Sequence, residues 1–262
     1  MTVLARWLAA WRERRTHRTL ERRAIPEGLW QLTLARYPFL AHRAASDVAE
    51  LRRLATLFLD RKEFSGAGGM QVDDEVAVAV AAQACLPILK LGLHRYDGFV
   101  GIVIHPDEVV AQRVVTDDDG VVHEYDETLS GEAMHGGPVM LSWPDVQAAG
   151  ESSAWAYNVV IHEFAHVLDM DSVATVGVTT PAQRAAQQTW LGDLSREYTA
   201  FCSEVDAGAQ TLVDPYGAES IEEFFAVCAE AFFVAPVDLL QQQPRLYALM
   251  QQYYLQDPAS SH

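Results

Sequence analysis

The sequence contains little cysteine, little positive charge and no long apolar run. Its three cysteines, Cys85, Cys202 and Cys228, are far apart and lie in apolar segments. Three such thiols suit neither a disulfide framework nor a zinc knuckle, so we expect reduced, buried side chains and a cytoplasmic protein. No segment reaches the roughly 18 consecutive apolar residues needed to span a bilayer, so no transmembrane segment is predicted.

Positive charge is also unevenly distributed. Lys and Arg total 19 against 36 Asp and Glu, and the formal net charge of −17 argues against direct binding to nucleic acid. Residues 1–25 are the exception, because seven Arg against two Glu give them a net charge of +5. Apolar residues there follow helical spacing, at Leu4, Trp7, Leu8 and Trp11. We predict an amphipathic helix that packs on the protein itself, with a membrane surface or a partner as the alternatives.

The pattern of apolar residues indicates the fold class. Half of the residues are apolar, which is typical of a globular protein with a substantial core. Helical and β-like patterns are segregated along the chain, so we predict an α+β fold with a mainly helical body and a small mixed sheet. The expected helices cover 2–23, 47–64, 73–91, 153–170, 181–205 and 221–233, and the expected strands cover 99–104, 109–115, 121–125 and 137–143.

The most specific pattern is HExxH at positions 162–166. His162 and His166 are four residues apart, so a helix places both imidazoles on one side, where they can bind one Zn²⁺. Glu163 then has the position of a general base that acts on water. The flanking residues are apolar and indicate a buried helix, in which an unpaired glutamate and two histidines would be costly.

A zinc site of this kind needs a third protein ligand. The carboxylate candidates lie in DPYGAESIEEFFAVCAEAFF and are Glu219, Glu222, Glu223 and Glu230. Glu223 and Glu230 share one face of an apolar helix, but Glu223 also fits an S-x-x-E capping box that begins at Ser220. Asp169 lies on the same face as His162 and competes as a ligand, although its short side chain better suits a hydrogen bond to an imidazole N–H.

Longer motifs resemble a known family. HEFAHVLD, the DPYGAESIEEFFAVCAEAFF segment, QQYYLQDP, FSGAGG, AAQACLPIL and GPVMLSW are similar to motifs of the Mlc titration factor A family of zinc-dependent peptidases. The resemblance covers about residues 60–258 and is weaker before them. It implies a zincin-like fold, one Zn²⁺ per chain held by His162, His166 and Glu223, and catalysis by Glu163 and Tyr216. The Tyr-x6-Glu spacing is also similar to that of the anthrax lethal factor catalytic domain.

The resemblance leads to a functional prediction with an alternative. We predict a zinc metallopeptidase in which Glu163 takes a proton from water and Tyr216 donates a hydrogen bond to the developing oxyanion, with aminopeptidase and endopeptidase action both open. The resemblance also implies binding to an Mlc-like, glucose-responsive transcription repressor. The alternative is therefore a protein that sequesters such a regulator while its hydrolysis is vestigial.

The last predictions concern the substrate and the domains. Pro138 near the start of the 137–143 strand indicates a sheet edge, because proline donates no hydrogen bond to the ladder. We expect a peptide substrate to pair with this edge. The residues involved would be Gly137, Pro138, Val139, Met140 and Leu141. Residues 1–25 are assigned to the Arg-rich helix and 26–262 to one peptidase domain, with a helical part at 26–95 and a catalytic core at 96–262.

Overall fold

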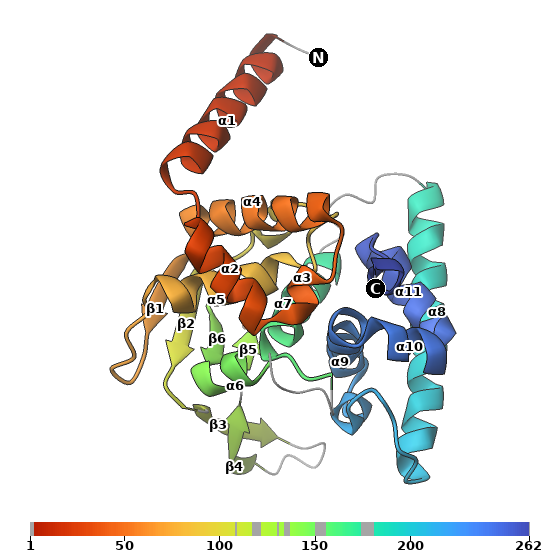
Figure 1. Ribbon diagram of the computed structural model, residues 1–262. Coiled ribbons are helices and arrows are strands. Elements are labelled where there is room, and N and C mark those ends of the chain that lie inside the picture. The colour runs from red at the N-terminus through yellow and green to blue at the C-terminus, as the bar shows by residue number, and fades with distance from the viewer. Residues whose placement is uncertain are drawn as a thin grey trace.

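Helix α7 (Val159–Val173) lies between an N-terminal and a C-terminal group of helices in the computed structural model (Figure 1). The structure describes residues 3–107, 109–116, 122–129, 131–133, 137–149, 156–173 and 181–261. The first group contains α1 (Val3–Arg22), α2 (Glu27–Arg36), α3 (Pro38–Ala41), α4 (Ala45–Arg61), α5 (Asp74–Cys85) and the short helix η1 (Leu93–Tyr96). The second contains α8 (Pro181–Asp206), η2 (Pro215–Ala218), α9 (Ile221–Val234), α10 (Pro236–Gln242), α11 (Pro244–Tyr254) and η3 (Pro258–Ser261). α7 contacts α5 of the first group and α9 of the second.

A small sheet lies beside α7, with its four strands in the order β1-β2-β6-β5. These strands are β1 (Glu63–Gly66), β2 (Gly101–His105), β6 (Val139–Ser142) and β5 (Gly131–Ala133). β1, β2 and β6 run parallel, whereas β5 is antiparallel to β6 and contacts α7. β3 (Val109–Thr116) and β4 (Val122–Leu129) form a separate antiparallel ribbon. The predicted α+β fold, with a mainly helical body and a small mixed sheet, is confirmed.

The predicted edge position of the 137–143 segment is wrong. Its strand, β6, hydrogen-bonds to β2 on one side and to β5 on the other, and the side chains of Val139 and Leu141 are buried. Pro138 precedes the strand, where its missing N–H costs no ladder bond, so it marks the start of β6 rather than an edge. Trp143 begins helix α6 (Trp143–Ala148). Among the described strands, the edge beside α7 is β5.

Three other boundaries also differ from the predictions. α7 begins at Val159 instead of 153, because the Asn158 side chain caps it by accepting a hydrogen bond from the Ile161 N–H at 3.0 Å. α5 ends at Cys85, six residues earlier than predicted. Strand β1 was missed, since α4 ends at Arg61 and the chain then pairs with β2.

An aromatic cluster fixes the face of α7 that lies opposite its histidines. The ring of Phe164 lies 5.0 Å from that of Tyr96 and 5.7 Å from those of Phe58 and Phe99. All four side chains are buried. Since aromatic pairs add about 0.5–1.5 kcal/mol each beyond the area that they bury, this cluster resists rotation or sliding of α7.

Helix α1 projects from the body, and its C-terminal end packs against α4 (Figure 1). Thr19 Oγ1 donates a hydrogen bond to Asp60 at 3.2 Å, and Arg23 pairs with the same carboxylate at 3.1 Å. The predicted helix is present, but the contacts described with the body are at its C-terminal end. The division into residues 1–25 and one domain at 26–262 stays a prediction. The three cysteines are free thiols. In the described part of the chain, no helix is both long and apolar enough to cross a membrane.

Candidate metal centre

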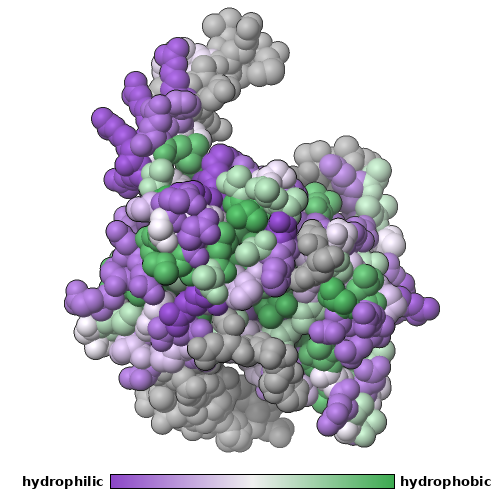
Figure 2. All heavy atoms as spheres, viewed as in Figure 1, coloured by the Kyte–Doolittle hydropathy of each residue, from purple (hydrophilic) through white to green (hydrophobic). Residues whose placement is uncertain are grey.

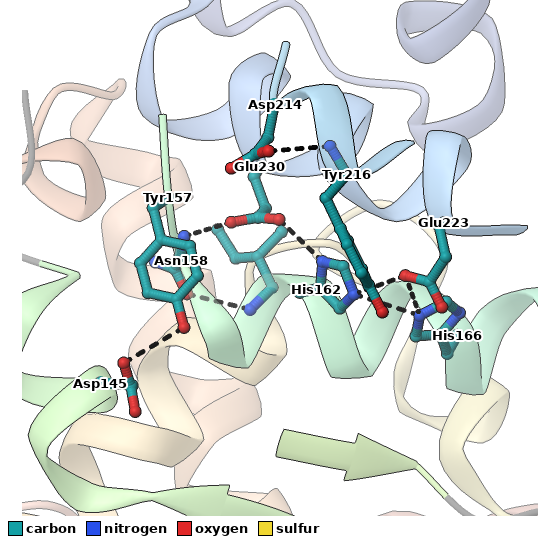
Figure 3. A network of polar contacts seen from close by, with 10 residues as sticks. Asp145, Tyr157, Asn158, His162, His166, Asp214, Tyr216, Glu223 and Glu230 are labelled. Carbon is teal, nitrogen blue, oxygen red and sulfur yellow. Dashed lines mark hydrogen bonds and ion pairs between the residues drawn. The ribbon is translucent and has the colours of Figure 1, made fainter. Parts of the chain in front are cut away.

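Helices α7 and α9 bring His162, His166 and Glu223 together (Figure 3). The two histidine Nε2 atoms are 3.2 Å apart, and Glu223 Oε2 lies 3.0 Å from that of His162 and 3.3 Å from that of His166. Ligand atoms at about 2.0–2.2 Å from a tetrahedral zinc ion are about 3.3–3.6 Å from one another. The triangle therefore has nearly the size required for one such ion, and the open side leaves a position for water.

The start of α9 explains how Glu223 reaches the histidines. Ser220 caps the helix by accepting a hydrogen bond from the backbone N–H of Glu223 at 3.1 Å, as the capping-box pattern predicts. The Glu223 carboxylate is directed to the imidazoles, so capping by its backbone and contact by its side chain occur together. The other early candidates, Glu219 and Glu222, are exposed.

Glu230 holds the opposite side of the His162 ring. Its Oε1 lies 2.8 Å from His162 Nδ1, and its Oε2 accepts a hydrogen bond from the backbone N–H of Asn158. Asn158 Nδ2 in turn donates to Gln83 Oε1 at 2.8 Å. Glu230 is only 4% exposed, so this network links α5, α7 and α9 within the core.

The sequence did not predict the contact between Glu230 and His162. It indicated Asp169 as the residue that accepts a hydrogen bond from an imidazole N–H. Asp169 belongs to α7, but its side chain lies outside the described residues. The available signal was the i, i+7 spacing of Glu223 and Glu230 on an otherwise apolar helix, which places two carboxylates about two turns apart on one face.

Glu163 is buried beneath the edge strand β5 and is 5% exposed. A Cβ atom on Gly131 would lie 2.6 Å from both Cγ and Oε1 of Glu163, so only glycine allows this close approach. The carboxylate accepts a hydrogen bond from the backbone of Ala133. Burial nevertheless raises the pKa of Glu163 to about 7.

Tyr216 lies at the mouth of the site on η2 and is 41% exposed. Asp214 holds the turn, because its Oδ1 accepts a hydrogen bond from the backbone N–H of Tyr216 at 2.9 Å. The Tyr216 ring is centred 6.2 Å from that of His162, and its hydroxyl end points toward the histidines and Glu223 (Figure 3). A Cβ on the buried Gly217 would lie 2.6 Å from Val227 Cγ2, so glycine lets η2 pack closely on α9.

The electrostatics of the site favour a bound cation. Burial lowers the pKa of His162, but hydrogen bonds to Glu223 and Glu230 outweigh this effect and raise it well above its ordinary value. Burial raises the pKa of Glu223, but the bonds to His162 and His166 bring it down to about 2. Burial raises the pKa of Glu230. Three carboxylates, counting Glu163, thus share two imidazoles, and a divalent ion would supply the missing positive charge.

The five residues predicted to bind substrate are not at a free edge. Val139 and Leu141 are buried, and the backbone of β6 is paired on both sides. The other three predicted residues, Gly137, Pro138 and Met140, are half-buried. β5 follows β6 in the strand order, so Gly131–Ala133 forms the edge of the sheet on this side.

Comparisons with known proteins show which family this chain resembles. Residues 9–255 match the profile of the family described as glucose-regulated metallo-peptidase M90. An uncharacterised protein of Synechocystis sp. is 34% identical over 256 residues, covering 96% of this chain and 90% of the relative. Proteins named Mlc titration factor A are also 34% identical. The one from Salmonella arizonae covers 88% of this chain and 92% of its own length, and the one from Salmonella typhimurium covers 88% and 86%.

Proposed function

The chain belongs to the glucose-regulated metallo-peptidase M90 family, and we propose that it is a zinc-dependent peptidase. The observation that carries this proposal is the triangle of His162 Nε2, His166 Nε2 and Glu223 Oε2, with sides of 3.0–3.3 Å. Two imidazoles and one carboxylate with an open fourth position are the ligand set of catalytic rather than structural zinc. The domain division and the one-zinc stoichiometry are part of this proposal.

The chemistry is divided between the ion and the side chains around it. Zinc, when bound, polarises the scissile carbonyl and lowers the pKa of water. Glu163 accepts a proton from water and delivers it to the leaving amine, and its burial beneath β5 keeps this proton transfer away from bulk solvent. Tyr216 donates a hydrogen bond to the developing oxyanion. Glu230 binds the Nδ1 side of His162, which directs the lone pair of Nε2 toward the ion.

We propose the outer edge of β5 as the place where an extended peptide binds. β5 is antiparallel to β6, is one of the two edge strands of the four-stranded sheet, and contacts α7. The backbone of Ala133 hydrogen-bonds to Glu163, so this edge leads directly to the proposed general base. A peptide that added to β5 would bring a backbone carbonyl past the metal ligands.

A second function, regulation of an Mlc-like repressor, is favoured by the names of the Salmonella relatives. Repressor binding and hydrolysis are compatible, since they need not use the same surface. If sequestration is the main function, Glu163→Gln will bind the repressor as wild type does. If the repressor is a substrate, only the wild-type protein will cleave it.

The proposed peptidase is tested by metal analysis together with peptide hydrolysis, with and without a chelator. We expect one zinc per chain, hydrolysis that stops on chelation and returns with Zn²⁺, and a Glu163→Gln variant that keeps the metal but is inactive. Glutamine preserves the size of the side chain but cannot accept the proton. Near-native turnover of Glu163→Gln would show that Glu163 is not the base.

A further inference from the structure

Helix α1 differs from the rest of the chain in charge and exposure, and the proposed active site uses none of its residues. Residues 1–25 carry +5, which leaves −22 for the remainder of the −17 chain. The 20-residue helix is about 30 Å long and projects from the body (Figure 1). Hydrophilic side chains cover the described part of it where it leaves the body (Figure 2).

Apolar and basic residues of α1 follow one another along a single stripe. Positions 4, 8, 11, 15, 18 and 22 alternate in steps of four and three, which places them on one side of a helix. The first three are Leu4, Leu8 and Trp11, and the last three are Arg15, Arg18 and Arg22, with Trp7 and Arg14 beside them. The stripe is thus apolar in its first half and basic in its second.

The described side chains at both ends of this stripe are exposed. Trp7 is 63% exposed, and Arg14, Arg18 and Arg22 are also exposed. The half-buried residues of the C-terminal half are on a neighbouring side that includes the contact with α4; they are Thr16, Thr19 and Leu20. Packing against α4 therefore holds the base of α1 without covering Arg14, Arg18 or Arg22.

We propose that α1 binds the surface of an anionic lipid membrane. Its apolar N-terminal half lies among the headgroups and upper acyl chains, and the arginines contact lipid phosphates. Tryptophan is enriched at bilayer interfaces, which suits the Trp7 end of the helix. This association is peripheral and does not depend on the proposed peptidase activity.

Binding of α1 to an anionic membrane is compatible with the strongly acidic body of the protein. The Debye length is about 8 Å at physiological ionic strength, so most of the negative charge on the body is screened from a membrane held by the outer half of the roughly 30 Å helix. Two acidic side chains of the body near the base of α1 are each paired, Asp60 with Arg23 and Asp97 with Arg61. An acidic protein surface, including a second copy, would match the arginines but offers no apolar layer for the Trp7 end.

The test uses the full chain and vesicles. We expect co-sedimentation with vesicles of 70% phosphatidylcholine and 30% phosphatidylserine, weak binding to pure phosphatidylcholine, and release by 0.5 M salt. Since each arginine contributes about a fivefold change in partitioning, the triple variant R14Q/R18Q/R22Q should bind roughly 100-fold more weakly.

A matched control carries the same charge change on exposed arginines of α8 and α11, in the variant R184Q/R196Q/R245Q. The control should bind vesicles like wild type, and both triple variants should hydrolyse a short peptide equally. Absence of wild-type binding to anionic vesicles, or equal loss of binding in both triple variants, would overturn the proposal. So would a concentration-dependent dimer that R14Q/R18Q/R22Q disperses, because a second copy would then be the occupant.

Discussion

Replacing Glu230 with glutamine tests whether the Nδ1 side of His162 controls metal binding. Glu230 accepts from the Asn158 backbone N–H with one oxygen and lies 2.8 Å from His162 Nδ1 with the other. Glutamine has nearly the same shape but offers one acceptor oxygen and one NH₂ group. Either Asn158 loses its acceptor or the NH₂ group faces His162 Nδ1, which then keeps its lone pair there and places the proton on Nε2, where the metal should bind.

The expected loss follows from the geometry of this pair. Removal of a carboxylate that orients a ligating histidine costs about 10–100-fold in metal affinity, or about 1.4–2.7 kcal/mol. We expect the upper part of this range, because Glu230 is 4% exposed and water cannot readily replace the lost acceptor. Glu230→Asp keeps the charge but shortens the side chain, so it should recover part of the affinity.

The assay is a zinc titration in competition with a chromophoric chelator. Thermal unfolding of the metal-free variants should be measured beside it, so that a general loss of stability is recognised. Glu222→Gln, on the exposed side of the same helix, is the control and should bind zinc like wild type. If Glu230→Gln were folded and had wild-type zinc affinity, the proposed orientation of His162 would be refuted.

Three further results are expected. Tyr216→Phe should lower kcat on the order of 10²-fold with zinc retained and KM little changed, because one oxyanion donor is lost; unchanged kcat in a metal-loaded variant would remove Tyr216 from the mechanism. Gly131→Ala should also lower kcat with zinc retained, since the new Cβ would lie 2.6 Å from Glu163 Cγ and must displace the carboxylate; activity equal to wild type would show that β5 yields instead. Burial lowers the pKa of Lys62 from 10.5 to about 8 in the folded protein, so between these pH values the unfolded chain binds more protons and stability should rise with pH. Denaturant unfolding at pH 8 and pH 10 should show that wild type gains stability relative to Lys62→Met over this range, and an equal pH dependence in the two proteins would contradict the assignment.

The local patterns predicted the elements of the site better than its long-range pairings. HExxH fixes the relative positions of His162 and His166 within one helix, and S-x-x-E marks the start of α9 at Ser220. Both depend on residues within about one turn, so sequence spacing is sufficient. That Glu223 meets the two histidines required the resemblance to a family, since spacing alone left four glutamates and Asp169 open.

The contacts that the sequence did not predict correctly join segments that are far apart in the chain. Which strand forms the edge depends on whether β5 pairs with β6, and a three-residue strand, Gly131–Ala133, is too short to show alternation. Glu230 reaches His162 across 68 positions of sequence, and the i, i+7 pattern on α9 does not show which neighbour its carboxylate meets. The predicted hydrogen bond from an imidazole to Asp169 stays a prediction, because that side chain lies outside the described residues.

The central claim is that His162, His166 and Glu223 hold one catalytic zinc ion. An anomalous difference map from a crystal of the zinc-loaded protein, recorded at the zinc absorption edge, tests it most directly. The account predicts one strong peak at bonding distance from the two Nε2 atoms and Glu223 Oε2, and its loss in Glu223→Ala but not in Glu222→Ala. A peak elsewhere, or none at this triangle in zinc-saturated crystals, would contradict it.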